Sequence, residues 1–265
     1  MVERIGLGLV GVMLALALFG PLLPLADPMS TDVSAAFHPP GDAHLFGTDH
    51  LGRDVLSRVV AAAGMDIGLA MAAVGLASTL GLVCGALAGW FGGWTDLTTG
   101  WMADLLLALP IYLMAMVLVG GIGNGLAVVV VATAAVNVPF FLRLVRTEVA
   151  RHRRSLWVDA ERLAGVADRH ILFAMVLPRV APLMVVQATT NLGWAMLNAA
   201  GLSFIGIGVR PPTPEWGVMI SEGARHLASG HWWLVVFPGG ALVLAVLGFH
   251  LAGDLCRDRL AQVSR

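Results

Sequence analysis

Residues 66–90 read DIGLAMAAVGLASTLGLVCGALAGW, an apolar run with almost no charge. A helix of this length extends about 37 Å, which exceeds the roughly 30 Å thickness of a bilayer's hydrocarbon core. Small residues recur along the run, as close packing between helices in lipid requires. We therefore expect these residues to form a membrane-spanning helix.

Similar apolar runs occur elsewhere along the chain, at residues 5–25, 100–121, 125–145, 180–206 and 233–253. The chain is 58% hydrophobic and only 12% charged, whereas soluble domains contain about 25% charged residues. These properties predict an all-α integral membrane protein with about six transmembrane helices. The first run is longer than the apolar core of a usual signal peptide, so we expect a retained first span.

The distribution of arginine predicts the orientation. All 16 basic residues are Arg. With the N-terminus inside, the outer segments hold only Arg53, Arg58, Arg210 and Arg225, and 16 minus these four leaves 12 on the inner side. Cytoplasmic loops carry the excess of basic residues. We therefore expect both termini to face the cytoplasm, an N-in/C-in topology.

The absence of Lys excludes two kinds of enzyme. A phosphate-binding P-loop needs Lys on the β- and γ-phosphates of ATP, and Schiff-base chemistry needs a Lys amine. Cys84 and Cys256 give neither a disulfide framework nor a Cys-x-x-Cys metal motif. We expect no metal site, no cofactor and no catalytic residue in this chain.

The longest inner segment, residues 146–178, is polar and rich in arginine. Its residues from Asp159 to His170 predict a short helix outside the membrane, broken by Gly165. Pro178 suits the first turn of the next helix, where its missing N–H group is harmless. An ordinary charged linker is the alternative interpretation.

This inner segment resembles the "EAA" loop of the permeases of binding-protein-dependent ABC importers. The family pattern is Glu-Ala-Ala, three residues, Gly, nine residues, an aliphatic residue, any residue and Leu-Pro. The sequence has the same spacing, with Asp in place of Glu, Glu in place of the second Ala, and Met175 at the aliphatic position. The resemblance implies that this loop couples the chain to an ATPase through Asp159, Ala160, Glu161, Arg162, Gly165, Leu177 and Pro178.

Two outer motifs resemble the second permease of peptide and nickel importers. One is the signature around Gly47, Thr48, Asp49, Gly52, Arg53 and Asp54; the other is Leu202–Gly208 followed by Pro211–Gly217. Asp54 and Arg58 are four residues apart and are expected to pair on a helix. We expect the first motif mainly to anchor the outer loop.

The resemblance implies an organisation and a set of partners. Residues 1–63 would form the first transmembrane helix and outer loop, and residues 64–265 the importer's transmembrane domain with the coupling loop at 146–178. The partners would be a second homologous permease, two ATPase subunits that hold ATP and Mg²⁺, a periplasmic or lipid-anchored substrate-binding protein, and the lipid bilayer, without nucleic acid. The location would be the bacterial inner membrane.

Polar residues within apolar runs raise three further hypotheses. Asp104 is a candidate path residue, although pairing with a neighbouring helix is the favoured role. Ser203 and His250 suggest an intramembrane serine protease, but they lie toward opposite ends of their spans. A secondary transporter would show inverted repeats and ionisable residues near the midplane, and neither is evident.

The substrate is either nickel, as a metal chelate, or a small peptide. The outer segments hold His38, His44, His50, His226 and His231. Imidazole suits nickel, and the sequences around His50 and Glu215 resemble nickel permeases, so a metal cargo is slightly favoured. Arg210 and Arg225 are outer groups that suit a peptide carboxylate.

Overall fold

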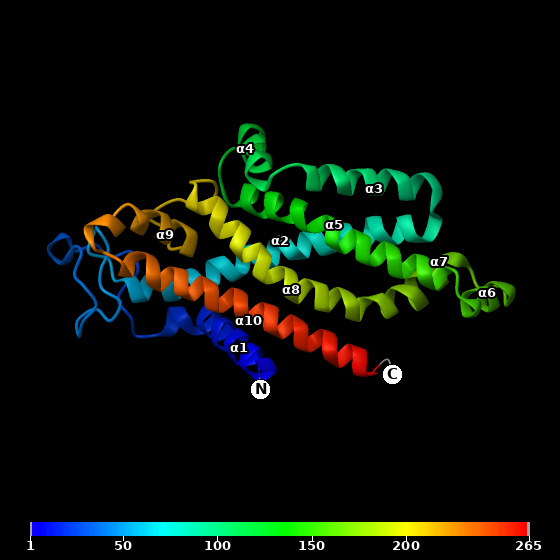
Figure 1. Cartoon of the computed structure of the whole chain (residues 1–265), viewed down its shortest axis with the longest axis horizontal. Coiled ribbons are helices and arrows are strands. Elements are labelled where there is room, and N and C mark those ends of the chain that lie inside the picture. The colour runs from blue at the N-terminus through cyan, green and yellow to red at the C-terminus, as the bar shows by residue number, and fades with distance from the viewer. Residues whose placement is uncertain (1, 264–265) are drawn as a thin grey trace.

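The computed structural model describes the backbone of residues 2–263 and the side chains of residues 5–259. The described chain is a bundle of long helices (Figure 1), which confirms the predicted all-α class. The helices are α1 (Val2–Phe19), α2 (Val55–Phe91), α3 (Gly93–Ala108), α4 (Ile111–Ile122), α5 (Leu126–Arg153), α6 (Leu156–Leu163), α7 (Asp168–His170), α8 (Leu177–Phe204), α9 (Trp216–Ala224) and α10 (Trp233–Val263).

Five helical stretches are long and apolar enough to cross a membrane: α1, α2, α5, the continuous stretch Asp168–Phe204 and α10. A sixth crossing would combine α3 and α4, which are bent by 98°. The predicted span at 100–121 is therefore not one continuous helix but two helices that meet at a bend. Pro110 has no N–H group and disfavours helical geometry at Leu109, whose backbone is extended. In addition, α2 begins at Val55, well before residue 66.

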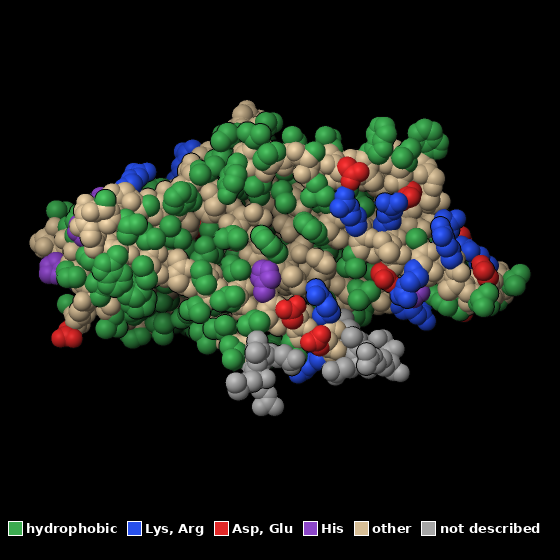
Figure 2. All heavy atoms as spheres, viewed as in Figure 1, with side chains coloured by type: hydrophobic (Ala, Val, Ile, Leu, Met, Phe, Trp, Pro, Cys, Tyr) green, Lys and Arg blue, Asp and Glu red, His purple; other side chains and the backbone are tan. Residues whose placement is uncertain are grey.

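The extramembrane segments gather at opposite ends of the bundle. Figure 1 shows the loop that precedes α2 close to α9 at one end, and α6 with α7 at the other. Hydrophobic side chains cover much of the middle, whereas most basic and acidic side chains in view lie toward the α6 end (Figure 2). The two predicted outer segments are therefore together, far from the predicted cytoplasmic segment.

Helices α2 and α5 pack backbone against backbone. A Cβ atom at Gly85 would lie 2.7 Å from the Leu142 carbonyl oxygen and 2.9 Å from Val145 Cβ. At Gly89, one turn further, it would lie 2.6 Å from the Arg146 carbonyl oxygen. Real Cβ atoms do not approach other atoms so closely, so these positions accept only glycine without a shift of the helices.

We predict that Gly85→Leu destabilises the chain by about 1–3 kcal/mol or more, because the added side chain has no space between α2 and α5. Gly75 lies on the same helix, and a Cβ atom there would have no neighbouring atom within 4 Å. Gly75→Leu should therefore change stability by about 0.5 kcal/mol or less. Thermal unfolding in detergent measures both. Equal melting temperatures for the two variants would contradict this packing.

Candidate coupling helix and outer ionic network

One face of α6 is buried and the other is exposed. Val158 is fully buried in a cluster that includes Ile171 and Val176. Leu156 and Leu163, at the two ends of α6, are 88% and 90% exposed. Val158 holds one side of α6 against the bundle. The two exposed leucines form an apolar surface suited to a protein partner.

Arg162 attaches α6 to its neighbours. Its guanidinium lies 5.3 Å from the centre of the Trp90 ring, at the end of α2, an attractive cation–π arrangement. Its Nε atom donates a hydrogen bond to Asp168 Oδ1 at 2.9 Å, and Nη1 donates to Asp159 Oδ1 at 3.4 Å. The side chain thus connects α6 with both α2 and the start of α7.

The predicted helix from Asp159 to His170, broken by Gly165, was wrong in its bounds but not in its break. Helix α6 begins at Leu156 and ends at Leu163, and a second helix begins at Asp168. Between them Gly165 adopts φ +83°, a left-handed conformation that favours glycine. The sequence prediction started the helix at its first polar residue, whereas its first turn contains the apolar residues that anchor it.

Leu177 and Pro178 lie inside a continuous helix. Residues Ile171–Val176 form a π-helical stretch that joins α7 to α8. This wider turn accommodates the Pro178 ring, which would otherwise clash with a preceding carbonyl group. The side chain of Arg179 donates a hydrogen bond to the Met175 carbonyl oxygen. Pro178 therefore lies in the first turn of α8, as predicted, although α8 continues without a break from the π-helical stretch before it.

The predicted coupling residues thus fall into two groups. Asp159, Ala160 and Gly165 are exposed on α6 and its turn, and Glu161 and Arg162 are half-buried beside them. Leu177 and Pro178 lie at the start of α8, where Leu177 is half-buried and Pro178 is exposed.

The outer signature begins helix α2. Asp54 Oδ1 accepts a hydrogen bond from the Ser57 N–H at 2.8 Å, and Asp54 Oδ2 lies 2.8 Å from His44 Nδ1. This N-capping arrangement aims the carboxylate at the first turn of the helix. Arg58 points elsewhere and donates to the carbonyl oxygens of Pro28 and Pro212. The predicted Asp54–Arg58 pair is therefore not formed.

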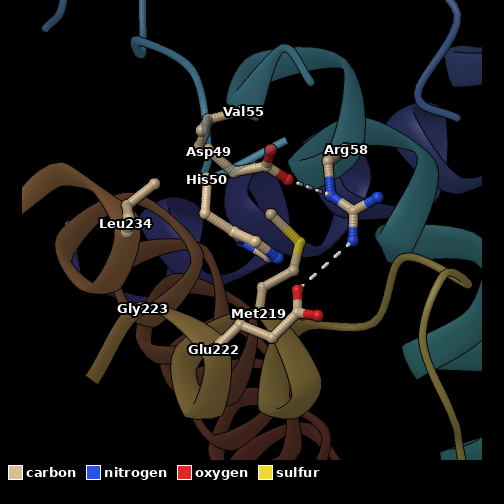
Figure 3. Close-up of a pocket in the computed structure, with 8 residues that line it drawn as sticks. All are labelled: Asp49, His50, Val55, Arg58, Met219, Glu222, Gly223 and Leu234. Carbon is tan, nitrogen blue, oxygen red and sulfur yellow. Dashed lines mark ion pairs between the residues drawn. The ribbon is translucent and has the colours of Figure 1, made fainter. Parts of the chain in front are cut away.

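A buried ionic network replaces that pair. Arg53 Nε donates to Asp49 Oδ2 at 2.6 Å, and Arg53 Nη2 lies 3.4 Å from Glu222 Oε2 on α9. Arg58 lies between the same two carboxylates, at 3.7 and 3.8 Å (Figure 3). Both arginines are 1% exposed. Two positive and two negative groups therefore join the outer loop, α2 and α9.

The rest of the signature folds the outer loop around this network. Gly47 and Gly52 both adopt φ +73°. Thr48 is fully buried; its Oγ1 atom accepts a hydrogen bond from the His38 N–H at 2.8 Å, and its carbonyl oxygen accepts one from Trp233 Nε1 at 3.1 Å. The cavity beside the network has a volume of about 10 Å³, far too small for a peptide or a chelate. The geometry therefore supports an anchoring role.

Asp104 lies on α3 and pairs with α5. Its Oδ1 atom is 2.7 Å from Arg143 Nη2, and both side chains are exposed. The preceding turns of α3 contain Asp96, which pairs with Arg146 of α5. Two ion pairs therefore connect α3 to α5 on the outside of the bundle.

The serine protease hypothesis fails on distance. Ser203 lies at the outer end of α8, whereas the His250 ring lies against Gly193. Ten helical residues separate Gly193 from Ser203, which is about 15 Å. Proton transfer needs contact at about 3 Å.

The outer histidines make packing contacts. The Phe37 ring lies 4.9 Å from His226 and 4.2 Å from His231, and His50 stacks on His226 at 5.8 Å. Among side chains 5–259, no group of three or more His, Cys, Asp or Glu residues could hold a metal ion.

Asp66 was not among the predicted site residues, yet it is fully buried on α2, where its carboxylate accepts a hydrogen bond from the N–H group of Trp216. Glu215, which is buried before α9, was also not among them. The signal for Asp66 was present, because it is the only charged residue in the apolar run 66–90.

This arrangement defines a multi-pass membrane protein with a long folded loop before α2 at one end and a short helix with two exposed leucines at the other. Residues 77–262 match the family described as "Binding-protein-dependent transport system inner membrane component". The chain belongs to this family and is a permease subunit of an ABC importer in the inner membrane.

Relatives of this kind cover nearly the whole chain. A dipeptide transport system permease protein of Alkalihalophilus pseudofirmus is 37% identical over 97% of this chain and 84% of its own length. A nickel transport system permease protein of Escherichia coli K12 is 36% identical over 97% of this chain and 92% of its own length. A probable D,D-dipeptide transport system permease protein of the same organism is 36% identical over 94% and 83% of the two chains.

We predict that Arg53→Leu destabilises the chain by about 3–5 kcal/mol, because it removes one partner from a buried ionic network. Arg225→Leu is the control, since Arg225 is an exposed arginine at the same end of the molecule, and surface substitutions change stability by about 0.5 kcal/mol or less. Thermal unfolding in detergent compares the two. A melting temperature for Arg53→Leu equal to that of Arg225→Leu would show that the network contributes nothing.

Proposed function

We propose that this permease forms half of a translocation path with a second homologous permease and couples it to ATP hydrolysis through α6. The observation that supports the proposal most strongly is the pair of exposed leucines on α6, at the tip of the bundle opposite the outer loop. Two separate ATPase subunits would bind ATP and Mg²⁺ and dock against α6. This chain would contribute no catalytic residue.

Movement of α6 would reach the membrane through its fixed contacts. Arg162 connects α6 to Trp90 at the end of α2 and to Asp168 at the start of the α7–α8 helix. Closure of the ATPase subunits would therefore shift α2 and α8 together with α6. Rigid-body rocking of the helix bundles would then open the path alternately to each side.

The α6 end would face the cytoplasm, with both termini inside. The opposite end, which carries the outer loop and α9, would receive the substrate-binding protein. The buried ionic network would keep this docking surface in one shape. Asp104 would lie beside the inner part of the path, where its exposed pair with Arg143 presents both charges.

We propose that the cargo is a small peptide, with a nickel chelate as the second candidate. The dipeptide and nickel relatives are equally similar to the chain, at 37% and 36% identity. The metal hypothesis relied on the outer histidines. His44 forms a hydrogen bond with Asp54, and His226 and His231 pack against Phe37. These imidazoles therefore already have structural roles at the outer end.

We predict that replacing both Leu156 and Leu163 with Ser abolishes transport-coupled ATP hydrolysis without loss of membrane insertion. The two side chains make few contacts within the chain, so their loss should affect only the docked partner. ATPase activity of the reconstituted importer, with and without loaded binding protein, measures the coupling. Leu227→Ser, an exposed leucine at the outer end, is the control and should retain coupling. Normal stimulation in the double variant would refute the docking role.

The orientation predicts opposite signals from reporter fusions. A fusion after Arg265 should report the cytoplasm, and an insertion between residues 208 and 216 should report the periplasm, because the arginine distribution places 12 of 16 basic residues inside. The same signal from both positions would contradict the six-span topology.

The substrate proposal predicts that uptake of a labelled dipeptide depends on this chain. Cells that express the complete importer are compared with cells that lack only this permease. Radiolabelled nickel, with and without chelators, is measured in parallel. Dependence of nickel uptake alone would replace the peptide proposal with the chelate.

A further inference from the structure

A polar contact is buried where three elements meet at the outer end of the bundle. Asp66 on α2, Ser203 near the end of α8 and Glu215 before α9 are 1%, 2% and 0% exposed, respectively. Figure 1 shows α9 beside the ends of α2 and α8 that face away from α6. None of these three side chains takes part in the ionic network or in coupling.

Backbone donors satisfy only one oxygen of each carboxyl group. The Trp216 N–H donates to Asp66 Oδ2 at 3.2 Å, and the Val218 N–H donates to Glu215 Oε2 at 2.7 Å. The other oxygens, Asp66 Oδ1 and Glu215 Oε1, have no hydrogen-bond partner within the described chain, and neither does Ser203 Oγ. Both carboxyl groups therefore lie at the first turn of α9, on N–H groups that are two residues apart.

The helices around Asp66 and Glu215 supply no positive charge to the two carboxyl groups. Residues 126–142 of α5, 186–204 of α8 and 233–249 of α10 contain no Asp, Glu, His or Arg. Tyr112 of α4 lies against Gly201, but its hydroxyl is neutral at ordinary pH.

The buried arginines at this end, Arg53 and Arg58, belong to the ionic network with Asp49 and Glu222, whereas Arg210 and Arg225 are exposed. Arg58 is eight residues before Asp66 on α2, about 12 Å along the helix. Its guanidinium already lies between Asp49 and Glu222. The carboxyl pair therefore has no cation of its own.

Two adjacent ionised carboxylates in a dry interior repel each other and lose their hydration. Such a pair retains one proton, and its titration belongs to the pair as a whole. One proton between Asp66 Oδ1 and Glu215 Oε1 would give both orphaned oxygens a partner.

We propose that Asp66 and Glu215 form a buried proton-binding site, which holds one proton at neutral pH and joins α9 to α2. The bound proton neutralises one carboxyl group. The other carboxyl group remains an acceptor for the N–H groups in the first turn of α9. The ligand is the proton itself, so the site does not depend on the identity of the transported substrate.

Burial raises the pKa of Glu215 above its ordinary value of 4.5. Because the pKa of Glu215 is raised in the folded state, the folded chain binds more protons than the unfolded chain at pH values above 4.5. The stabilisation is complete below pH 4.5 and is lost as the pH rises through the raised pKa. A difference of one proton changes the unfolding equilibrium constant by about tenfold per pH unit.

Infrared spectroscopy of the full chain in lipid nanodiscs tests the site. At pH 7 the wild-type chain should show the absorption band of a protonated, hydrogen-bonded carboxyl group. Specific ¹³C labelling of Asp or Glu should shift this band, and this test requires no amino-acid substitution. The band should be lost in the isosteric variants Asp66→Asn and Glu215→Gln. It should remain in the control Asp254→Asn, which removes an exposed carboxylate on α10.

The pH dependence of unfolding gives a second readout. Wild type and Asp254→Asn should lose stability as the pH rises above 4.5, whereas Asp66→Asn should lose less. Absence of a protonated carboxyl band from wild type at pH 7 would overturn the proposal. So would a band that neither labelling nor the Asp66 and Glu215 variants change.

Discussion

The close approach of α2 and α5 is the contact on which the rest of the structure depends. In a bilayer, helices gain little from the hydrophobic effect, so direct packing must hold them together. Glycines at 81, 85 and 89 remove the side chains that would separate the two backbones. Because α2 begins at the outer signature and α5 ends at α6, this pair of helices runs from one functional end of the molecule to the other.

Each end of this helix pair is fixed by a different kind of interaction. At the outer end, Arg58 of α2 lies in the buried ionic network that reaches Glu222 on α9. At the inner end, Trp90 of α2 lies under Arg162 of α6. A displacement of α6 would therefore be transmitted along packed helices, and flexible loops would not need to carry it. This arrangement supports our proposal that the chain responds to ATPase closure as a rigid body.

The sequence predicted the helical class and the position of Gly165 at a turn, because apolar run length and glycine geometry are local properties. Partners distant in the sequence could not be predicted in this way. Spacing alone favoured an Asp54–Arg58 pair, yet Arg58 finds Asp49, Glu222 and two loop carbonyl groups once the chain folds. Pro110 is a local signal for a bend, but apolar residues on both sides of it gave one continuous apolar run, and the prediction followed the run. Asp66 was visible as a lone charge, although its partner Glu215 is 149 residues away.

The central claim is that α2 and α5 move as one unit while the importer cycles. Spin labels at the exposed positions Met71 and Phe140, in a chain whose Cys84 and Cys256 are replaced by Ser, report the distance between the two helices. Pulsed electron paramagnetic resonance on the reconstituted importer should give the same distance distribution without nucleotide and with ATP bound. A distribution that shifts or splits on ATP binding would contradict the account.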